Sequence, residues 1–306
     1  MLAAFITTIF FSISIICANR STKLIGGTEA NFWRLTCATV FLSIWAVCFG
    51  EGFSGGSYPI FFVSGVIGIG VGDVALFQTL PRLGSRLTLL LVQCLTAPFG
   101  ALIEWLWLGT TLSPLQMLCG ATILAGIAIS LAPGEHVNVP RGQLFPGIVF
   151  SIVAALGGAY GAVLSRKAYA VAGSEAVSID AGTAAFQRVV GGLLVAGICL
   201  LVVKRQHIRA TMVKSADTPA LSSREKWRRI WPWVLANGLA GQTIGVTCYQ
   251  WAFKTAPTGI VLPIVATTPL VAIPFSLWME GERPGVRSII GGIIAVTGVA
   301  GLALLK

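Results

Sequence analysis

Charged side chains inside long apolar stretches are the residues of this sequence best placed to do chemistry. Asp73, Glu104, Arg34 and Arg188 each lie within a run of apolar residues. A charge at the centre of a bilayer costs about 2.5–3.5 kcal/mol on insertion scales, so such residues face a partner or a water-filled path. Asp73 lies nearest the middle of its run and is the preferred candidate to bind a solute or carry a proton.

Each of these residues also has a structural interpretation. Asp73 could form an ion pair with Arg82 or Arg86, which follow at the next junction between runs. Glu104 lies close enough to the end of its run to reach the membrane interface. The two arginines lie near the starts of their runs and could reach water by snorkelling. They are candidates for gating, for a charge pair or for contact with a solute carboxylate.

Uncharged polar and aromatic residues inside the runs are further candidates to line a solute path. These are Gln78, Gln93, Tyr160, Asn237, Gln242, Tyr249, Gln250 and Trp251. Gln242 and Tyr249 are seven residues apart, which places them on one face of a helix. Such a face suits a wet cavity and suits hydrogen bonds between helices equally well, and the sequence leaves both interpretations open.

Two prolines occupy equivalent positions in the middle of apolar runs. Pro98 and Pro269 each remove one backbone hydrogen bond from a helix, which predicts a kink at each site. A carbonyl freed by a kink is tolerated in a membrane where it faces a polar path.

The patterns of the common enzyme and cofactor sites are missing from the sequence. Residues 52–56 read G-x-S-x-G, but they lie between two apolar runs with no strand before them. Both histidines, His136 and His207, lie outside the apolar runs, so a buried Ser–His pair is not expected. No nucleotide-binding or metal-ligand spacing occurs. We expect no catalytic residue, no metal, no cofactor and no ATP-driven step.

Composition indicates a protein embedded in lipid. The chain has 306 residues, of which only 10% are charged, and a mean hydropathy of +0.85. Soluble domains carry about 25% charged residues. The formal net charge of +10 would suggest nucleic acid on a soluble fold. The apolar runs exclude that fold, so the expected partners are the bilayer and a small-molecule solute, without nucleic acid.

The apolar runs predict an all-α integral membrane fold with ten transmembrane helices. A crossing helix needs about 20 apolar residues, and the runs are continuously apolar, unlike the alternating strands of a barrel. Their approximate cores are 2–18, 30–49, 58–80, 87–108, 114–132, 145–165, 181–203, 232–253, 258–279 and 286–305.

The two halves of the chain resemble each other. A-x-F-x-R occurs at 30–34 and again at 184–188, and several glycines and one Pro follow in the same order in both halves. The predicted units are 1–132, a linker at 133–144, and 145–306, which includes a basic loop at 204–230. Five spans is an odd number, so the second unit enters the membrane from the opposite side, as in the inverted repeats of alternating-access transporters.

Residues 72–113 (GDVALFQTLPRLGSRLTLLLVQCLTAPFGALIEWLWLGTTLS) and 258–284 (TGIVLPIVATTPLVAIPFSLWMEGERP) resemble the fourth and ninth helices of the EamA family. This family belongs to the drug/metabolite transporter superfamily, whose members have ten helices in two repeats. The resemblance implies export of a small metabolite, either amino acid-like or drug-like. The family's Gly-Glu pair matches Gly281 and Glu282, whereas Thr110 and Thr111 occupy that place in the first half. Glu282 is therefore a gating or charge-pair candidate in one repeat only.

Orientation gives two conflicting expectations. Connections on the side away from the termini hold 15 of the 21 Lys and Arg residues, so the positive-inside rule places both termini outside the cytoplasm. The family resemblance places both inside. In either case we expect a multi-pass protein of the cell membrane, and the sequence leaves a homodimer open. A non-transporting scaffold or sensor that acts through the 204–230 loop is the alternative function.

Overall fold

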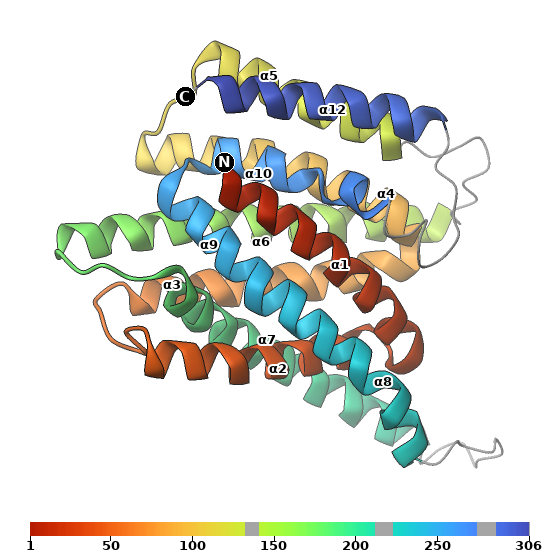
Figure 1. Cartoon of the computed structure of the whole chain (residues 1–306). Coiled ribbons are helices and arrows are strands. Elements are labelled where there is room, and N and C mark those ends of the chain that lie inside the picture. Colours follow the sequence, from red (N-terminus) through yellow and green to blue (C-terminus); the bar gives the residue numbers. More distant parts are fainter. Residues whose placement is uncertain (132–140, 212–222, 274–285, 306) are drawn as a thin grey trace.

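The computed structural model of the chain describes residues 1–131, 141–211, 223–273 and 286–305. Within these ranges the secondary structure is helical, with no strands. The helices lie alongside one another as an elongated bundle, and the two ends of the chain lie at the same end of that bundle (Figure 1). The all-helical class predicted from the continuous apolar runs is therefore confirmed.

The helices of the first half are α1 (Leu2–Ile25), α2 (Gly27–Cys48), α3 (Tyr58–Gly65), the π-helix η1 (Val66–Val71), α4 (Gly72–Leu108) and α5 (Pro114–Leu131). Those of the second half are α6 (Arg141–Ser174), α7 (Ala181–Thr211), α8 (Ser223–Asn237), the π-helix η2 (Gly238–Gly245), α9 (Val246–Thr255), α10 (Thr258–Ala266) and α12 (Val286–Leu304).

In the described part of the chain, eight helices are long and apolar enough to cross a membrane. They account for eight of the ten predicted spans. The predicted span 232–253 is helical from α8 through α9, but polar residues such as Asn237 and Gln242 make it less apolar than the others. The predicted span 258–279 is described only as far as residue 273. The count of ten remains a prediction.

Three predicted connections are shorter in the structure than in the sequence analysis. The chain stays helical between the predicted spans 58–80 and 87–108. The predicted basic loop 204–230 loses residues at both ends, because α7 continues to Thr211 and α8 begins at Ser223. Most of the predicted linker 133–144 lies outside the described residues, although α6 already begins at Arg141. Hydropathy marks where a helix leaves lipid, whereas charged residues can continue the helix into water.

The two π-helices occupy equivalent places in the two halves. The glycines at 65, 68 and 72 align at one constant offset with those at 238, 241 and 245. Gly65 and Gly72 flank η1, and Gly238 and Gly245 are the first and last residues of η2. Short π-segments are rare and occur frequently at functional sites. The glycine spacing was visible in the sequence, but the π-helical winding was not predicted from it.

Most of the large helix contacts join the first half of the chain to the second. Helix α2 packs against α7, α4 packs along α6, and α5 pairs with α12. The α5–α12 pair lies at one edge of the bundle (Figure 1). There the helices approach closely because Gly126 lies opposite Gly291 and Ala295, where a Cβ would collide with backbone atoms.

The two prolines predicted to kink helices differ in their surroundings. The chain makes a turn at Thr267, two residues before Pro269. Pro269 cannot donate to the Val265 carbonyl, which instead accepts from Thr268 Oγ1 at 2.5 Å. At Pro98, in contrast, α4 continues as a helix.

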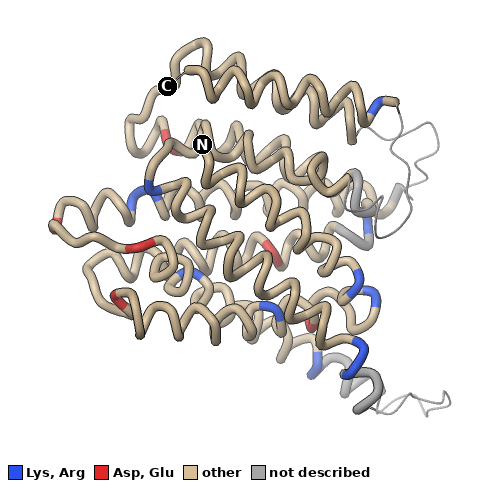
Figure 2. The backbone as a smooth tube through the Cα atoms, in the orientation of Figure 1, with Lys and Arg blue, Asp and Glu red and all other residues tan. Residues whose placement is uncertain are grey.

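Charged residues gather at the two ends of the bundle, and few lie in its middle (Figure 2). This distribution is expected of a protein whose middle zone is surrounded by lipid hydrocarbon.

Candidate functional site: a central cavity

A cavity of about 240 Å³ lies between the two halves of the chain. The π-helix residues Gly68 and Ile69 from η1, and Gly241 and Gln242 from η2, form part of its wall. Six of the residues predicted from the sequence also line it: Arg34, Asp73, Gln93, Arg188, Gln242 and Tyr249. The cavity therefore brings together candidates from both halves that are far apart in the sequence.

An ion pair forms one part of the cavity wall. Arg34 Nη2 lies 2.5 Å from Asp73 Oδ2, and Arg34 Nε donates to Asn31 Oδ1 at 2.8 Å. The guanidinium of Arg34 also lies over the ring of Phe77, 5.6 Å from its centroid. The Asp73 carboxylate is thus paired from α2, by a residue of a different helix.

Of the two ion-pair partners suggested for Asp73 by sequence proximity, Arg82 was wrong. Arg82 instead donates to the main-chain carbonyl of Gln78 and, at 3.0 Å, to its side-chain oxygen. Arg82 also lies over the ring of Phe150. The side chain of Arg86 lies outside the described residues. Proximity along the chain favoured the junction arginines, whereas packing of α2 against the first turn of α4 supplies Arg34.

Arg188 lines the same cavity without a comparable partner. The residue is 4% exposed, and its Nε and Nη1 atoms have no hydrogen-bond partner among the described residues. The ionisable groups near it are Tyr249, Tyr169 and Asp73. A buried charge ordinarily has a partner, so Arg188 is an unusual feature of this bundle.

Two polar side chains of the second half add unsatisfied hydrogen-bonding groups near the cavity. Gln242 lines the cavity, and its Oε1 has no partner among the described residues. Asn237, one turn before it, accepts from Ser14 Oγ at 2.6 Å but leaves its Nδ2 unpaired. Such groups in an apolar bundle suit a cavity that receives a polar ligand or water.

Six other predicted path residues are not among those that line this cavity: Gln78, Glu104, Tyr160, Asn237, Gln250 and Trp251. Gln78 lines a separate groove between α4 and α7. Tyr160 and Trp251 are each 44% exposed on the outside of the helices. Glu104 lies elsewhere in the interior, where it binds Arg166 and Thr258. Glu282 lies outside the described residues.

Glu104 joins three helices near the end of the bundle that holds the chain termini. Its Oε1 accepts from Arg166 Nε at 3.0 Å, and its Oε2 accepts from the backbone N–H of Thr258 at 2.6 Å and from the Thr258 hydroxyl. Arg166 also donates to the Phe253 carbonyl at 2.9 Å. A carboxylate at the first turn of α10 satisfies its free N–H groups and its dipole. Glu104 is therefore part of a network that ties α4, α6, α9 and α10 together.

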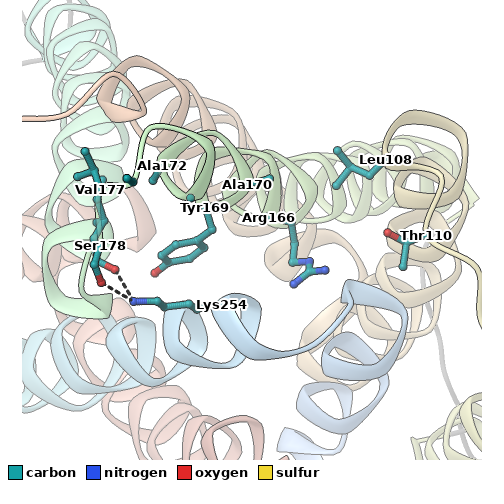
Figure 3. A pocket seen from close by; sticks show the side chains of 12 residues that line it. Leu108, Thr110, Arg166, Tyr169, Ala170, Ala172, Val177, Ser178 and Lys254 are labelled. Carbon is teal, nitrogen blue, oxygen red and sulfur yellow. Dashed lines mark hydrogen bonds between the residues drawn. The ribbon is translucent and has the colours of Figure 1, made fainter.

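A second, larger hollow of about 580 Å³ lies beside this network. Arg166, Tyr169 and Lys254 extend into it from α6 and α9 (Figure 3). Lys254 Nζ donates to the Ile179 carbonyl at 2.9 Å and lies 3.5 Å from Ser178 Oγ. The hollow thus has a positively charged rim at one end of the bundle.

Several cavity residues were not predicted from the sequence. Asn31 supports Arg34 from one turn away, and the i, i+3 spacing could have identified it. Phe11, Ser14 and Thr96 also line the cavity. Small hydroxyl and apolar side chains of this kind have no distinguishing signal in a sequence where most residues are apolar.

Comparisons with known proteins agree with this architecture. One solved structure, described only as a crystal structure of a protein, superposes with a TM-score of 0.75 at 16% identity, covering 99% of this chain and 96% of its own. That likeness concerns the fold alone. No curated protein matches the chain. A model of the EamA-like transporter family, in the drug/metabolite transporter superfamily, matches residues 1–132 and 145–304. The chain is thus a multi-pass membrane protein that belongs to the EamA-like transporter family.

Proposed function

We propose that the protein is a secondary active transporter of the cell membrane that exports a small metabolite through the central cavity. The observation that carries the proposal is a cavity between the two halves, lined by Asp73, Arg188 and both π-helices. Its volume of about 240 Å³ is below the ~300–1,000 Å³ of pockets for drug-sized ligands. A small metabolite is therefore the proposed cargo.

Alternating access between two inverted repeats is the proposed mechanism. Residues of both π-helices, η1 and η2, line one cavity, which supports this mechanism. Substrate sites of such transporters lie at the repeat interface, where helices are irregular. Rocking of one half against the other would expose this cavity to each side of the membrane in turn.

The end of the bundle near the termini is the proposed closed gate. Along α9, Tyr249 lines the cavity and Lys254 lines the outer hollow, with the fully buried Phe253 between them. The rings of Tyr249 and Phe253 lie 4.2 Å apart. The network of Glu104 and Arg166 holds the Phe253 carbonyl. These contacts would have to open for solute to pass between the cavity and the outer hollow.

The Arg34–Asp73 pair is the proposed site of proton coupling. A proton on Asp73 would cancel its charge and release Arg34 toward the cavity. Efflux of the exported compound from proteoliposomes under an imposed pH gradient tests this role. Equal gradient dependence for the parent and for the Arg34→Gln/Asp73→Asn double variant would remove the pair from the coupling mechanism.

A cavity-filling substitution tests the proposed path. Gly158 lines the cavity, and a Cβ there meets only Thr96, at 3.5 Å. Gly158→Leu is expected to fill the cavity and abolish export, measured as metabolites that accumulate in the medium of overexpressing cells relative to vector controls. Gly292→Leu is the matched control, because nothing lies within 4 Å of its Cβ position.

The same assay separates the proposal from the scaffold alternative. Loss of export in Gly158→Leu with normal export in Gly292→Leu supports transport through the cavity. Normal function in Gly158→Leu, with loss on deletion of residues 212–222 from the basic segment, would contradict the proposal and favour the scaffold or sensor.

A further inference from the structure

The two A-x-F-x-R motifs place one arginine of each half in equivalent surroundings. Arg34 and Arg188 both line the central cavity. A Cβ at Gly238 would lie 3.0 Å from the Arg34 carbonyl oxygen, and a Cβ at the aligned Gly65 would collide with the Arg188 carbonyl oxygen. Each arginine therefore packs its backbone against the corresponding glycine of the other half.

The internal partners of the two arginines nevertheless differ. Arg34 is bound by Asn31 and Asp73. At the aligned positions the second half has Ala185, three residues before Arg188, and Val246, directly after Gly245. Both groups that satisfy the first guanidinium are thus replaced by apolar side chains in the second half.

The consequence is a buried cation on the cavity wall. Arg188 is 4% exposed, and its Nε and Nη1 atoms have no hydrogen-bond partner among the described residues. Arg34, Asp73 and Arg188 are the charged residues among those described as lining the cavity. Because the first two neutralise each other, one positive charge remains. A guanidinium presents its N–H groups as a planar fork that matches the two oxygens of a carboxylate.

We propose that Arg188 is the recognition site for a carboxylate on the transported solute, so that the substrate class is a small organic monoanion. This inference rests on the proposed transport function and narrows it. A single excess charge favours a carboxylate over a phosphate ester, which carries about −1.5 to −2 charges at pH 7. The solute carboxylate takes the place that Asp73 holds in the other half.

The remaining cavity wall fits the body of such a solute. Phe11, Ile15 and Leu76 offer apolar contacts. Gln242 Oε1 is an unpaired acceptor on the same wall, which suits an N–H or O–H group of the solute. The cavity thus offers one cation, one acceptor and an apolar surface.

The proposal can be tested without removing Arg188, by giving Arg188 the carboxylate partner that Arg34 has in the first half. In Val246→Asp, the new carboxylate occupies the position equivalent to Asp73 and would pair with Arg188, so added carboxylates should no longer bind. Val246→Asn is the matched control, since it has the same shape without the charge. Arg188→Gln removes the cation itself.

Binding is measured on the purified full chain in nanodiscs, as the rise in melting temperature with ligand concentration. The probes are benzoate, phenylacetate and 2-oxoisovalerate, with benzamide, phenyl phosphate and chloride as comparisons. We expect at least one carboxylate to stabilise the parent and Val246→Asn. In Val246→Asp and Arg188→Gln its half-saturating concentration should rise by about tenfold or more, as loss of a charge-assisted hydrogen bond implies.

Three results would overturn the assignment. The first is that benzamide, phenyl phosphate or chloride raises the melting temperature of the parent as much as the carboxylates do. The second is that carboxylates bind undiminished to both Val246→Asp and Arg188→Gln, and the third is that no carboxylate of the panel stabilises the parent. If the export assay identifies a neutral or cationic cargo, the carboxylate assignment fails and transport stands. If carboxylates bind through Arg188 but the parent exports nothing, the transport proposal fails and the anion site stands.

Discussion

Arg34 on α2 and Asp73 on α4 form an ion pair in the cavity wall, with 2.5 Å between Nη2 and Oδ2. Their side chains are 10% and 21% exposed, so water screens the pair only in part. The aligned arginine of the second half, Arg188, has no such carboxylate among the described residues. The two aligned arginines thus differ in their charge partners, and the difference lies where solute is proposed to bind.

Breaking the Arg34–Asp73 pair from one side should destabilise the fold. Asp73→Asn leaves Arg34 without its counter-ion beside a second cation, and loss of one partner of a buried pair costs about 3–5 kcal/mol. We expect the lower end of that range, because Asp73 is partly exposed. The double variant Arg34→Gln/Asp73→Asn should recover most of the loss. Free energies of unfolding of the purified variants give the comparison, and a double variant no more stable than Asp73→Asn contradicts the pairing.

Glu104 should matter for stability and for gating, but not for the affinity of the cavity. Glu104→Gln removes the charge that holds Arg166 and caps α10, which is expected to cost about 1–3 kcal/mol. The half-saturating concentration of a bound carboxylate should not change, because Glu104 is not among the residues that line the cavity. Glu29→Gln is the control: its pairing with Lys204 is 3.9 Å long and exposed, worth at most about 1 kcal/mol. A change in affinity for Glu104→Gln would contradict this separation of roles.

Two neighbouring glycines on α12 should respond oppositely to the same substitution. A Cβ at Gly291 would collide with the Gly126 carbonyl oxygen and lie 2.5 Å from Ser130 N, whereas nothing lies within 4 Å of a Cβ at Gly292. Gly291→Ala should therefore lower the free energy of unfolding by about 1–3 kcal/mol, because the added methyl group overpacks the helix contact. Gly292→Ala should be neutral or gain up to about 1 kcal/mol from helix propensity. Equal unfolding free energies for the two variants would contradict the close α5–α12 contact.

Asp180, between α6 and α7, should make stability depend on acid pH. Burial raises the pKa of Asp180, but hydrogen bonds from the Thr183 hydroxyl, Trp45 Nε1 and the backbone N–H groups of Thr183 and Gly182 outweigh it, so the pKa lies below its ordinary value. The stabilisation is therefore complete above the unfolded-state pKa of about 3.9 and disappears as pH falls through the lower, folded-state value.

Melting temperatures measured from pH 7 down to pH 3 test this expectation, within the range where the detergent-solubilised protein stays soluble. Asp180→Asn should melt below the parent at pH 7, and the difference should narrow only below about pH 4. A difference that stays constant down to the lowest pH, or that narrows already near neutrality, would assign the stabilisation to another group.

The parts of the fold that depend on the local run of residues were predicted from the sequence. Continuous apolar runs of about 20 residues have few alternatives to a membrane helix, and eight such helices occur in the described ranges. The run from α8 to α9 is less continuously apolar than the other spans, because it contains Asn237 and Gln242, whose side chains face the interior and not lipid. The π-helical winding of η1 and η2 was not predicted, since glycine spacing alone does not distinguish π from α.

The candidate site was predicted less well from the sequence than the fold was, because the contacts of the site join distant parts of the chain. The chemical types of Asp73, Arg34 and Arg188 marked them for attention, and all three line one cavity. The partner of Asp73 was wrongly sought at Arg82, since proximity in sequence says nothing of which helices pack together. Glu104, like Asp73, is a carboxylate inside an apolar run. In the structure, however, it caps α10 by binding Thr258, which lies 154 residues away in the sequence.

Access to the cavity from both sides of the membrane is the most direct test of the account. Thr96 lines the cavity, so Thr96→Cys in a background without the seven native cysteines reports on it through a membrane-impermeant thiol reagent. Val296→Cys, at a residue that is 65% exposed on α12, is the control and should stay unlabelled in lipid. Alternating access predicts labelling of Thr96→Cys both in intact cells and in inside-out vesicles of an export-competent protein. Labelling from one side only, whatever solute is supplied, would contradict transport by alternating access through this cavity.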